Sequence, residues 1–391
     1  MIFQKVKLGD VITFKNGKGI NDEKRDKDGK YLIYGSNGVI GKTNEVLVEG
    51  KNIIIGRVGA YCGSLRYIDQ PSWITDNAIY GISSEEVDDR YMYLLLTTLD
   101  LRNYAGGSAQ PLLNQTVLKN ISVDIPNKTI QTKIADILFN LLDFIKLNNS
   151  INETLETLAL TLYNNWFIDF GPFQDDEFVE SELGIISNGW EVKKLKDISN
   201  ILMGQSPKSE FYNQIGEGLP FHQGVTNFGN RFPTNTTYSS KLLRVAQEGD
   251  FLISVRAPVG RINIAHTKMV IGRGLSAISS KTNTPSYLLY TLKVIFNEED
   301  RYGSGTIFNS INKGELENLK VIVPDQKIMN EYEDKVSKID QLIKMNHEQT
   351  IIVTNTTDYL LPRLISGEID ISEAAEIVKE VILNEQPEPS V

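Results

Sequence analysis

The sequence predicts an α+β protein in which two similar α/β domains follow each other in tandem, separated by a pair of long antiparallel helices. Two observations predict this fold. A long-helix pattern occurs twice in the same register, with Asn346 standing 198 positions after Asn148. Each helix pattern follows a region of short β-type segments and glycine-rich turns, and these two regions resemble each other. A chain that repeats itself in this way is expected to form two related modules with pseudo-twofold symmetry.

The helix pattern is a seam of apolar residues at alternating steps of four and three, which is typical of paired helices. In the first stretch the seam is Ile130, Ile134, Ile137, Leu141, Phe144, Ile151, Leu155, Leu158 and Leu162. In the second it includes Ile328, Tyr332, Leu342, Val353 and Leu360. Each helix is expected to span roughly 37 residues, or about 55 Å at about 1.5 Å per residue. A lone helix with such a seam needs a partner, and the other long helix is available within the chain.

One seam position is polar in both stretches, at Asn148 and Asn346. Antiparallel pairing would bring the centres of the two helices together, so we expect these asparagines to face each other. A polar residue in a seam fixes the register of the pair at some cost in stability. The alternative is that both asparagines point toward water at a local break.

The predicted modules comprise residues 1–128 and 191–324. Each has an opening strand, a polar glycine-rich loop, a β-rich strand ending in arginine, a short apolar helix and a closing strand. Pro126 and Pro324 end the closing strands and start the helices, as proline before a first turn tends to do. The long helices are placed at 129–170 and 325–366, an acidic linker at 171–190, and an acidic tail at 367–391 whose end is expected to be disordered.

Composition limits the classes of protein that this chain can be. It has 391 residues, enough for two or three domains, and carries neither a long apolar run nor a signal peptide. The single cysteine, Cys62, cannot form an internal disulfide, which fits a reducing compartment. We therefore expect a cytoplasmic protein.

The two modules are less acidic than the chain as a whole. The net charge is −10, yet residues 191–324 hold 16 Lys and Arg against 11 Asp and Glu, and residues 1–128 hold 16 against 15. The helices, linker and tail carry the excess of acid. Because a bound polyanion senses the local field, the two modules remain compatible with nucleic-acid binding.

Catalytic and metal-binding motifs are missing from the sequence. Ser36–Thr43 resembles a phosphate-binding loop but has serine where the first glycine is required, and a strand pattern follows it. Glu191 and Lys193 could be half of a nuclease pair, but no acidic partner precedes them. His222, His266 and His347 lack metal-ligand spacing, and His222 is expected to lie at the surface. The sequence therefore predicts neither a catalytic nor a metal site.

Several segments resemble the specificity subunit of type I restriction–modification enzymes. Ile130–Leu138, Asn148 with Ile151–Ala159, and Trp166–Pro172 together resemble the central conserved region of that family. Ser181–Val192 resembles the opening of its second recognition domain, and Leu360–Asp370 resembles its C-terminal conserved region. The resemblance spans most of the chain.

The resemblance implies a non-catalytic subunit that recognises DNA. Each target-recognition domain would read one half of a split, asymmetric site in double-stranded DNA, and the helix pair would set the unread spacer. Two methyltransferase (M) subunits, which use S-adenosylmethionine to methylate adenine at N6, would dock on the helices. Two restriction (R) subunits, which translocate and cut DNA with ATP, would complete the complex. No cofactor is expected on this chain, and S-adenosylmethionine, ATP and Mg²⁺ are expected on the partner subunits.

Three groups of residues are candidates for DNA contact. Loop residues offer donors to phosphates and base edges: Lys15, Lys18, Lys24 and Arg25 in the first module, and Gln205, Ser206 and Lys208 in the second. Arg57 and Arg256, assigned to equivalent strand ends, suit phosphate or guanine. Amide and hydroxyl residues before the closing strands suit adenine: Ser108, Gln110 and Asn114, with Thr306, Asn309 and Asn312.

Each group also has a structural explanation. The arginines could form buried salt bridges, and the alternating charges around Lys24 and Arg25 could mark a solvated loop. The amides could cap turns. For the whole chain, the alternative is a coiled-coil adaptor without DNA binding, although its modules would have no reason to be less acidic than their connectors. A solitary nuclease or methyltransferase is the weakest alternative because its motifs are missing.

Overall fold

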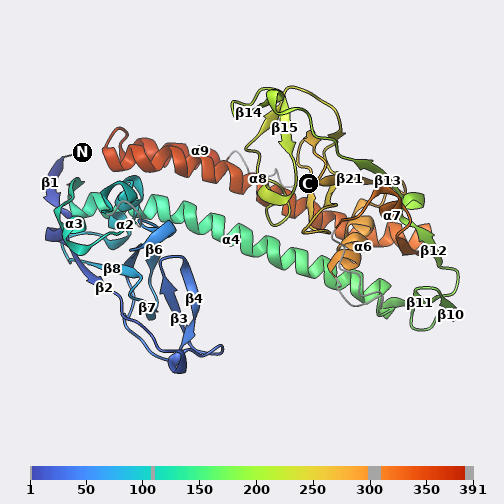
Figure 1. Cartoon of the computed structure of the whole chain (residues 1–391), viewed down its shortest axis with the longest axis horizontal. Coiled ribbons are helices and arrows are strands. Elements are labelled where there is room, and N and C mark those ends of the chain that lie inside the picture. Colours follow the sequence, from blue (N-terminus) through green and yellow to red (C-terminus); the bar gives the residue numbers. More distant parts are fainter. Residues whose placement is uncertain (1, 107–110, 298–309, 384–391) are drawn as a thin grey trace. The chain divides into compact units, whose positions relative to one another are not determined.

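The computed structural model describes residues 2–106, 111–297 and 310–383, and it divides into two compact units (Figure 1). Unit 1 comprises Met1–Ser150 and Asn346–Val391, and unit 2 comprises Ile151–Met345. The two long helices are α4 (Lys128–Phe167) and α8 (Gln326–Ser366). Each helix therefore contributes one half to each unit. In the described residues no helix is both long and apolar enough to cross a membrane.

Unit 1 contains a four-stranded sheet with the strand order β2-β8-β5-β6. Strands β3, β4 and β7, which lie between β2 and β8 in the sequence, form a separate three-stranded sheet with the order β4-β3-β7. Its strands are β1 (Phe3–Lys7), β2 (Ile12–Asn16), β3 (Tyr31–Gly35), β4 (Gly38–Thr43), β5 (Asn52–Gly56), β6 (Leu65–Ile68), β7 (Ser72–Ile74), β8 (Ala78–Ser83) and β9 (Ser122–Pro126). Its shorter helices are α1 (Leu8–Val11), α2 (Asp89–Thr98), α3 (Gln115–Asn120) and α9 (Ile371–Leu383). Strands β1 and β9, the first and last of the module, pair antiparallel.

Unit 2 repeats this arrangement, with the four-stranded sheet β13-β21-β18-β19, the pair β12-β22 and a second sheet β14-β16-β15-β20-β17. Its strands are β10 (Phe178–Ser181), β11 (Gly184–Ser187), β12 (Glu191–Lys194), β13 (Ser199–Met203), β14 (Tyr212–Asn213), β15 (Leu219–His222), β16 (Tyr238–Ser239), β17 (Val245–Ala246), β18 (Phe251–Ser254), β19 (Ile262–Ile264), β20 (Met269–Ile271), β21 (Leu275–Ser280) and β22 (Lys320–Val323). Its helices are α5 (Leu195–Ile198), α6 (Pro285–Asn297) and α7 (Lys313–Glu317). The tandem repeat predicted from the sequence is present in the strand order.

The long helices pair antiparallel within each unit. In unit 2, Asn152 Nδ2 donates to the Ile343 carbonyl at 3.3 Å, and the Tyr332 hydroxyl donates to the Ala159 carbonyl at 3.2 Å. Higher numbers on α4 thus meet lower numbers on α8. In unit 1, Leu138 and Leu141 of α4 share one buried core with Val353, Leu360 and Leu364 of α8.

Three of the predicted seam residues are exposed, which corrects the seam in detail. Ile151, Leu158 and Leu342 are 36%, 53% and 43% exposed. In the second half of α4 the buried apolar residues are instead Ala159, Tyr163, Trp166 and Phe167, which join the core of unit 2. The physical reason is that each helix packs against a module as well as against the other helix. A heptad seam accounts only for the helix–helix contact.

The acidic tail and linker are more ordered than their charge suggests. In the tail, α9 places Ile371, Ala374 and Val378 on the unit 1 core, while Asp370 Oδ1 accepts hydrogen bonds from the first turn. The sequence contained a signal for this helix, because an aspartate that can cap a helix is followed by apolar residues at helical spacing. The linker contains the β10–β11 hairpin. The end of the tail, 384–391, lies outside the described residues.

Candidate nucleic-acid interface

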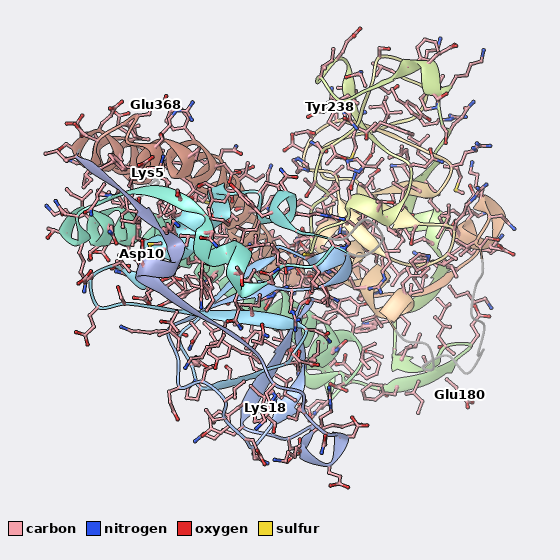
Figure 2. The ribbon with its side chains drawn as sticks, turned by 60° about the vertical axis from the view of Figure 1, so that its left-hand side comes forward. Lys5, Asp10, Lys18, Glu180, Tyr238 and Glu368 are labelled. Atoms are coloured by element: carbon pink, nitrogen blue, oxygen red, sulfur yellow. The ribbon has the colours of Figure 1, made fainter. Side chains whose placement is uncertain are left out.

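In unit 1, two predicted features meet at one tight turn, Thr75–Ala78, which joins β7 to β8. The turn is closed by Ala78 N donating to the Thr75 carbonyl at 3.0 Å. From the loop after β2, Lys18 N donates to the Ile74 carbonyl at 2.8 Å. From the end of β5, Arg57 N donates to the Asn77 carbonyl at 3.0 Å. Figure 2 shows Lys18 far from Lys5, which lies near the helices of the same unit.

Unit 2 repeats this arrangement around the turn Gly272–Leu275, which joins β20 to β21. Leu275 N donates to the Gly272 carbonyl at 3.0 Å. Gln205 N from the loop after β13 donates to the Ile271 carbonyl at 2.9 Å, and Val255 N donates to the Gly274 carbonyl at 2.9 Å. The repeat therefore extends to individual backbone hydrogen bonds. We call these two segments the edge turns.

A glycine starts the loop beside each edge turn because no side chain fits there. A Cβ on Gly17 would lie 2.1 Å from the Thr75 carbonyl oxygen, and a Cβ on Gly204 would lie 2.1 Å from the Gly272 carbonyl oxygen. Both distances are far below van der Waals contact with backbone atoms that cannot move away cheaply. The glycine-rich character of both loops thus has the same steric cause.

The strand-end arginines are not structurally equivalent, which corrects the sequence-based assignment. Leu113 N donates to the Arg57 carbonyl at 2.9 Å, whereas its counterpart Ile311 N donates to the Val255 carbonyl at 3.0 Å. Arg57 therefore corresponds to Val255, and Arg256 stands one residue further along. Matching the two arginines by identity shifted the register, which only strand pairing fixes. A one-residue shift in a strand reverses the face on which a side chain lies.

The environments of the two arginines also differ. Arg256 is exposed. Arg57 is half-buried, its Nη1 donates to the Asp76 carbonyl at 3.3 Å, and its Nε is buried without a partner. Neither guanidinium forms an ion pair within the described ranges 2–106, 111–297 and 310–383. The alternative prediction, that these arginines form buried salt bridges, is therefore not met in the described residues.

The other predicted contacts divide into accessible and occupied side chains. Lys15 and Lys18 are exposed. Lys24 forms an ion pair with Glu45 at 2.8 Å, and Arg25 lies 3.4 Å from Asp22, so both charges are partly neutralised. In unit 2 the exposed Lys208 lies 3.9 Å from Glu210. Gln205 and Ser206 lie in the loop beside the edge turn of unit 2.

The amide residues that the structure describes act as helix caps. Asn114 Oδ1 accepts from Val117 N at 2.9 Å at the start of α3, and Asn312 Oδ1 accepts from Glu315 N at 3.1 Å at the start of α7. This is the capping role that their position before a helix also allows. Ser108, Gln110, Thr306 and Asn309 lie outside the described residues.

Sequence reasoning missed the polar residues of the edge turns themselves. In unit 2, Ser206 Oγ donates to Gln223 Oε1 at 2.8 Å and accepts from Arg273 N at 3.1 Å. Gln223 and Arg273 are exposed, as is Asp76 in unit 1. A short polar turn between two apolar strands was the available signal, at Thr75–Ala78 and Gly272–Leu275.

His222 is buried, which corrects its assignment to the surface. It lies on β15, only 2% exposed, and its Nε2 is 3.0 Å from Asn235 Oδ1. Asn235 Nδ2 lies 3.3 Å from His266 Nε2. Burial lowers the pKa of His222 and so favours the neutral ring. Within the part of the chain that the structure describes, no cluster of side chains could hold a metal ion.

A buried charge cluster fastens the unit 2 module to both helices of that unit. Arg231 is 8% exposed and forms ion pairs with Glu156 of α4 and Asp340 of α8. Lys293 of α6 also pairs with Glu156. Burial raises the pKa of Glu156, but Arg231 and Lys293 lower it more, so it lies below its ordinary value. We call these four residues the Arg231 cluster.

The two seam asparagines lie together within unit 1. Asn148 is 5% exposed and Asn346 is 8% exposed, and Asn148 Nδ2 donates to the Asn346 carbonyl at 3.4 Å. They are buried at a helix–helix contact and do not point into water. That this contact fixes the register stays a prediction.

Comparison with known proteins identifies the family. The model of the type I restriction modification DNA specificity domain matches twice, at residues 2–157 and 187–354. A Methanocaldococcus jannaschii protein provisionally named MjaX specificity subunit of a type I restriction enzyme is 34% identical, covering 73% of this chain and 69% of its own length. The MjaIX specificity subunit of the same organism is 31% identical, covering 75% and 72%.

The crystal structure of the S subunit of a type I restriction–modification system from M. genitalium shares the fold. It has a TM-score of 0.61 at 18% identity, with 93% of this chain and 96% of that chain covered. The two family matches fall on the two modules, each with part of the long helix that follows it. The chain belongs to the family of type I restriction–modification specificity subunits.

Proposed function

We propose that this chain is the DNA sequence-recognition subunit of a type I restriction–modification complex, and that each module reads one half of a bipartite, asymmetric site in double-stranded DNA. The observation that carries the proposal is the double family match, once on each module. The two edge turns have the same backbone hydrogen bonds but different side chains. Two modules of one architecture with different polar residues would read two different half-sites.

The candidate DNA contacts belong to this proposal. Lys15 and Lys18, which are exposed near the edge turn of unit 1, would bind phosphates or base edges, and Arg256 would do so in unit 2. Lys24, Arg25 and Lys208 would have to exchange their present carboxylate partners for phosphate, which is inexpensive for exposed pairs. Asn114 and Asn312 would contribute mainly as helix caps.

The chain would act without catalysing a reaction itself. Methyltransferase subunits that bind S-adenosylmethionine and restriction subunits that use ATP and Mg²⁺ would carry the chemistry. Exposed apolar residues of the long helices, among them Ile151, Leu158 and Leu342, are available for docking of the methyltransferase subunits. The length of the helix pair would set the number of unread base pairs between the half-sites.

Methylation mapping with the partner subunit tests the proposal. The chain is co-expressed with its methyltransferase partner, and methylated adenines are mapped across a genome. We expect one split motif with a spacer of constant length. An active methyltransferase that leaves no such motif would contradict the proposal and favour a coiled-coil adaptor without DNA binding.

A module exchange tests the division of labour. Residues 191–324 are replaced by the corresponding module of a relative with a different motif, and the methylated sequence is mapped again. We expect one half-site to change while the other half-site and the spacer persist. A change in both halves would mean that the modules do not read independently.

A further inference from the structure

The two edge turns place residues of opposite charge at the same structural position. Asp76 follows Thr75 in the turn closed by Ala78, and Arg273 follows Gly272 in the turn closed by Leu275. The residue before each turn corresponds as well, because Lys18 N binds the carbonyl of Ile74 and Gln205 N binds that of Ile271. Sequence comparison alone does not pair an aspartate with an arginine. The hydrogen-bond register does.

Both charged side chains are exposed. Among the residues that the structure describes, neither the Asp76 carboxylate nor the Arg273 guanidinium takes part in a hydrogen bond or ion pair. Lys24, Arg25 and Lys208, by contrast, each lie within 4 Å of a carboxylate. Asp76 and Arg273, like the exposed Lys18 of the neighbouring loop, thus present a charge that no ion pair in the described residues neutralises.

The backbone beneath each charge is held rigidly. The Asp76 carbonyl accepts from Arg57 Nη1 at 3.3 Å, and Arg273 N donates to Ser206 Oγ at 3.1 Å. Each turn also packs closely against the glycine of the adjacent loop, where an added Cβ would lie 2.1 Å from a carbonyl oxygen of the turn. A charged group on a fixed turn loses little conformational freedom when it binds, which favours selective recognition.

We propose that Asp76 and Arg273 are specificity-determining residues at one equivalent position of the two half-sites. The inference rests on the proposed function. Arginine pairs bidentately with the O6 and N7 acceptors of guanine, whereas aspartate accepts from the amino group of cytosine. Arg273 therefore selects guanine in the half-site of the second module, and Asp76 selects a base with an amino donor, cytosine above all, in the half-site of the first. Gln223, oriented by Ser206 at 2.8 Å, lies beside Arg273 in the second module.

The test is base preference in a methylation assay with the complete complex of this chain and its methyltransferase partner. For Arg273→Ala we expect discrimination for guanine to fall about 10- to 100-fold at a single position of one half-site. For Asp76→Ala we expect a similar relaxation at a single position of the other half-site. Lys268→Ala and Asp69→Ala are matched controls because both residues are exposed and lie outside the edge turns, before the strands that lead into them. Neither variant should change any base preference.

A conservative variant separates recognition from general attraction to DNA. Arg273→Lys keeps the positive charge but lacks the planar fork, so methylation of the original site should persist with weakened preference for guanine. A phosphate contact would behave differently, because its loss weakens methylation of all sequences equally. Unchanged base preference in Arg273→Ala and Asp76→Ala, with a bipartite motif in the wild type, overturns the inference and leaves the proposed function intact. No motif in the wild type would instead contradict the proposed function.

Discussion

Unit 1 and unit 2 have the same sheet order and the same edge-turn hydrogen bonds, yet they are attached to the long helices by different interactions. In unit 1 the ion pair between the module and α4 is Arg90 with Asp136 at 2.7 Å, and these side chains are 30% and 53% exposed. In unit 2 the corresponding attachment is the Arg231 cluster, in which Arg231 is 8% exposed. The same backbone arrangement is thus attached to the helices by an exposed ion pair in unit 1 and by a buried charge cluster in unit 2.

The difference shows which parts of the repeat depend on geometry and which on side-chain chemistry. Backbone hydrogen bonds and close-packed glycines recur because the same path of the chain requires them. The side chains that attach each module to the helices differ between the two units, and so do the polar side chains of the edge turns. They can differ because several combinations of side chains are compatible with the same backbone path. The experiments below test this distinction, beginning with the largest expected effect.

The largest effect should follow removal of Arg231. Arg231→Ala would leave Glu156 and Asp340 without their common partner, and we expect it to destabilise unit 2 by about 3–5 kcal/mol. Asp136→Ala, which removes the exposed partner of Arg90 in unit 1, should cost about 0–1 kcal/mol. Denaturant unfolding of the full chain measures both. Equal losses would show that the two attachments do not differ in kind.

An added methyl group beside the edge turns should have the next largest effect. Gly17→Ala and Gly204→Ala place a Cβ against a backbone carbonyl, so each should destabilise its own unit by about 1–3 kcal/mol. Gly19→Ala and Gly224→Ala are the controls, because the nearest atom to a Cβ on Gly19 is 4.0 Å away and nothing lies within 4 Å of one on Gly224. Thermal unfolding gives the comparison. Similar effects at all four glycines would exclude the steric explanation.

The seam asparagines should have a smaller effect that depends on whether one or both are changed. Asn148→Leu removes the donor to the Asn346 carbonyl while Asn346 stays polar and buried, and should cost about 1–3 kcal/mol. Changing both residues to leucine should recover most of this loss, because apolar pairs suit a helix seam. Unfolding of both variants measures stability. If Asn148 fixes the register, the double variant should also relax the spacer length in methylation mapping, and an unchanged spacer would refute that role.

The smallest effect should be a pH dependence specific to unit 2. Because the folded-state pKa of Glu156 is lowered, its ion pairs contribute stability above the unfolded-state pKa of about 4.3 that is lost as the pH falls through the folded value. The difference in unfolding free energy between the wild type and Glu156→Gln should therefore be largest near neutral pH and shrink in acid. A difference that grew in acid would have the wrong sign.

Much of the fold could be predicted because the sequence repeats itself. The tandem modules, the two long helices and the contact of Asn148 with Asn346 follow from patterns that occur at fixed spacing. The helix α9 was within reach of the same reasoning, because Asp370 and the apolar spacing after it were visible, but net acidity masked them. Details within a pattern were harder, as the exposed Leu158 and Leu342 demonstrate.

The candidate site could be predicted only in part. The sequence paired the glycine-rich loop that contains Lys18 with the one that contains Gln205, and the two loops make corresponding backbone hydrogen bonds in the structure. Glycine was the useful signal because it marks a close approach of two backbone segments. The equivalence of Arg57 with Arg256 was wrong by one residue, and Asp76 and Arg273 were overlooked. Residues matched by chemical type need not correspond in space, and here the corresponding residues have opposite charges.

The sequence by itself determined the tandem organisation and the family of the protein, because the long-range repeat and the motifs that resemble specificity subunits are properties of the linear chain. The tertiary structure decided which residues share a position. Strand pairing sets the register to a single residue, and a one-residue shift moves a side chain to the opposite face of a sheet. The placement of Asp76 and Arg273 on matching turns, and the burial of Arg231 between α4 and α8 of unit 2, arise from contacts between segments distant in sequence.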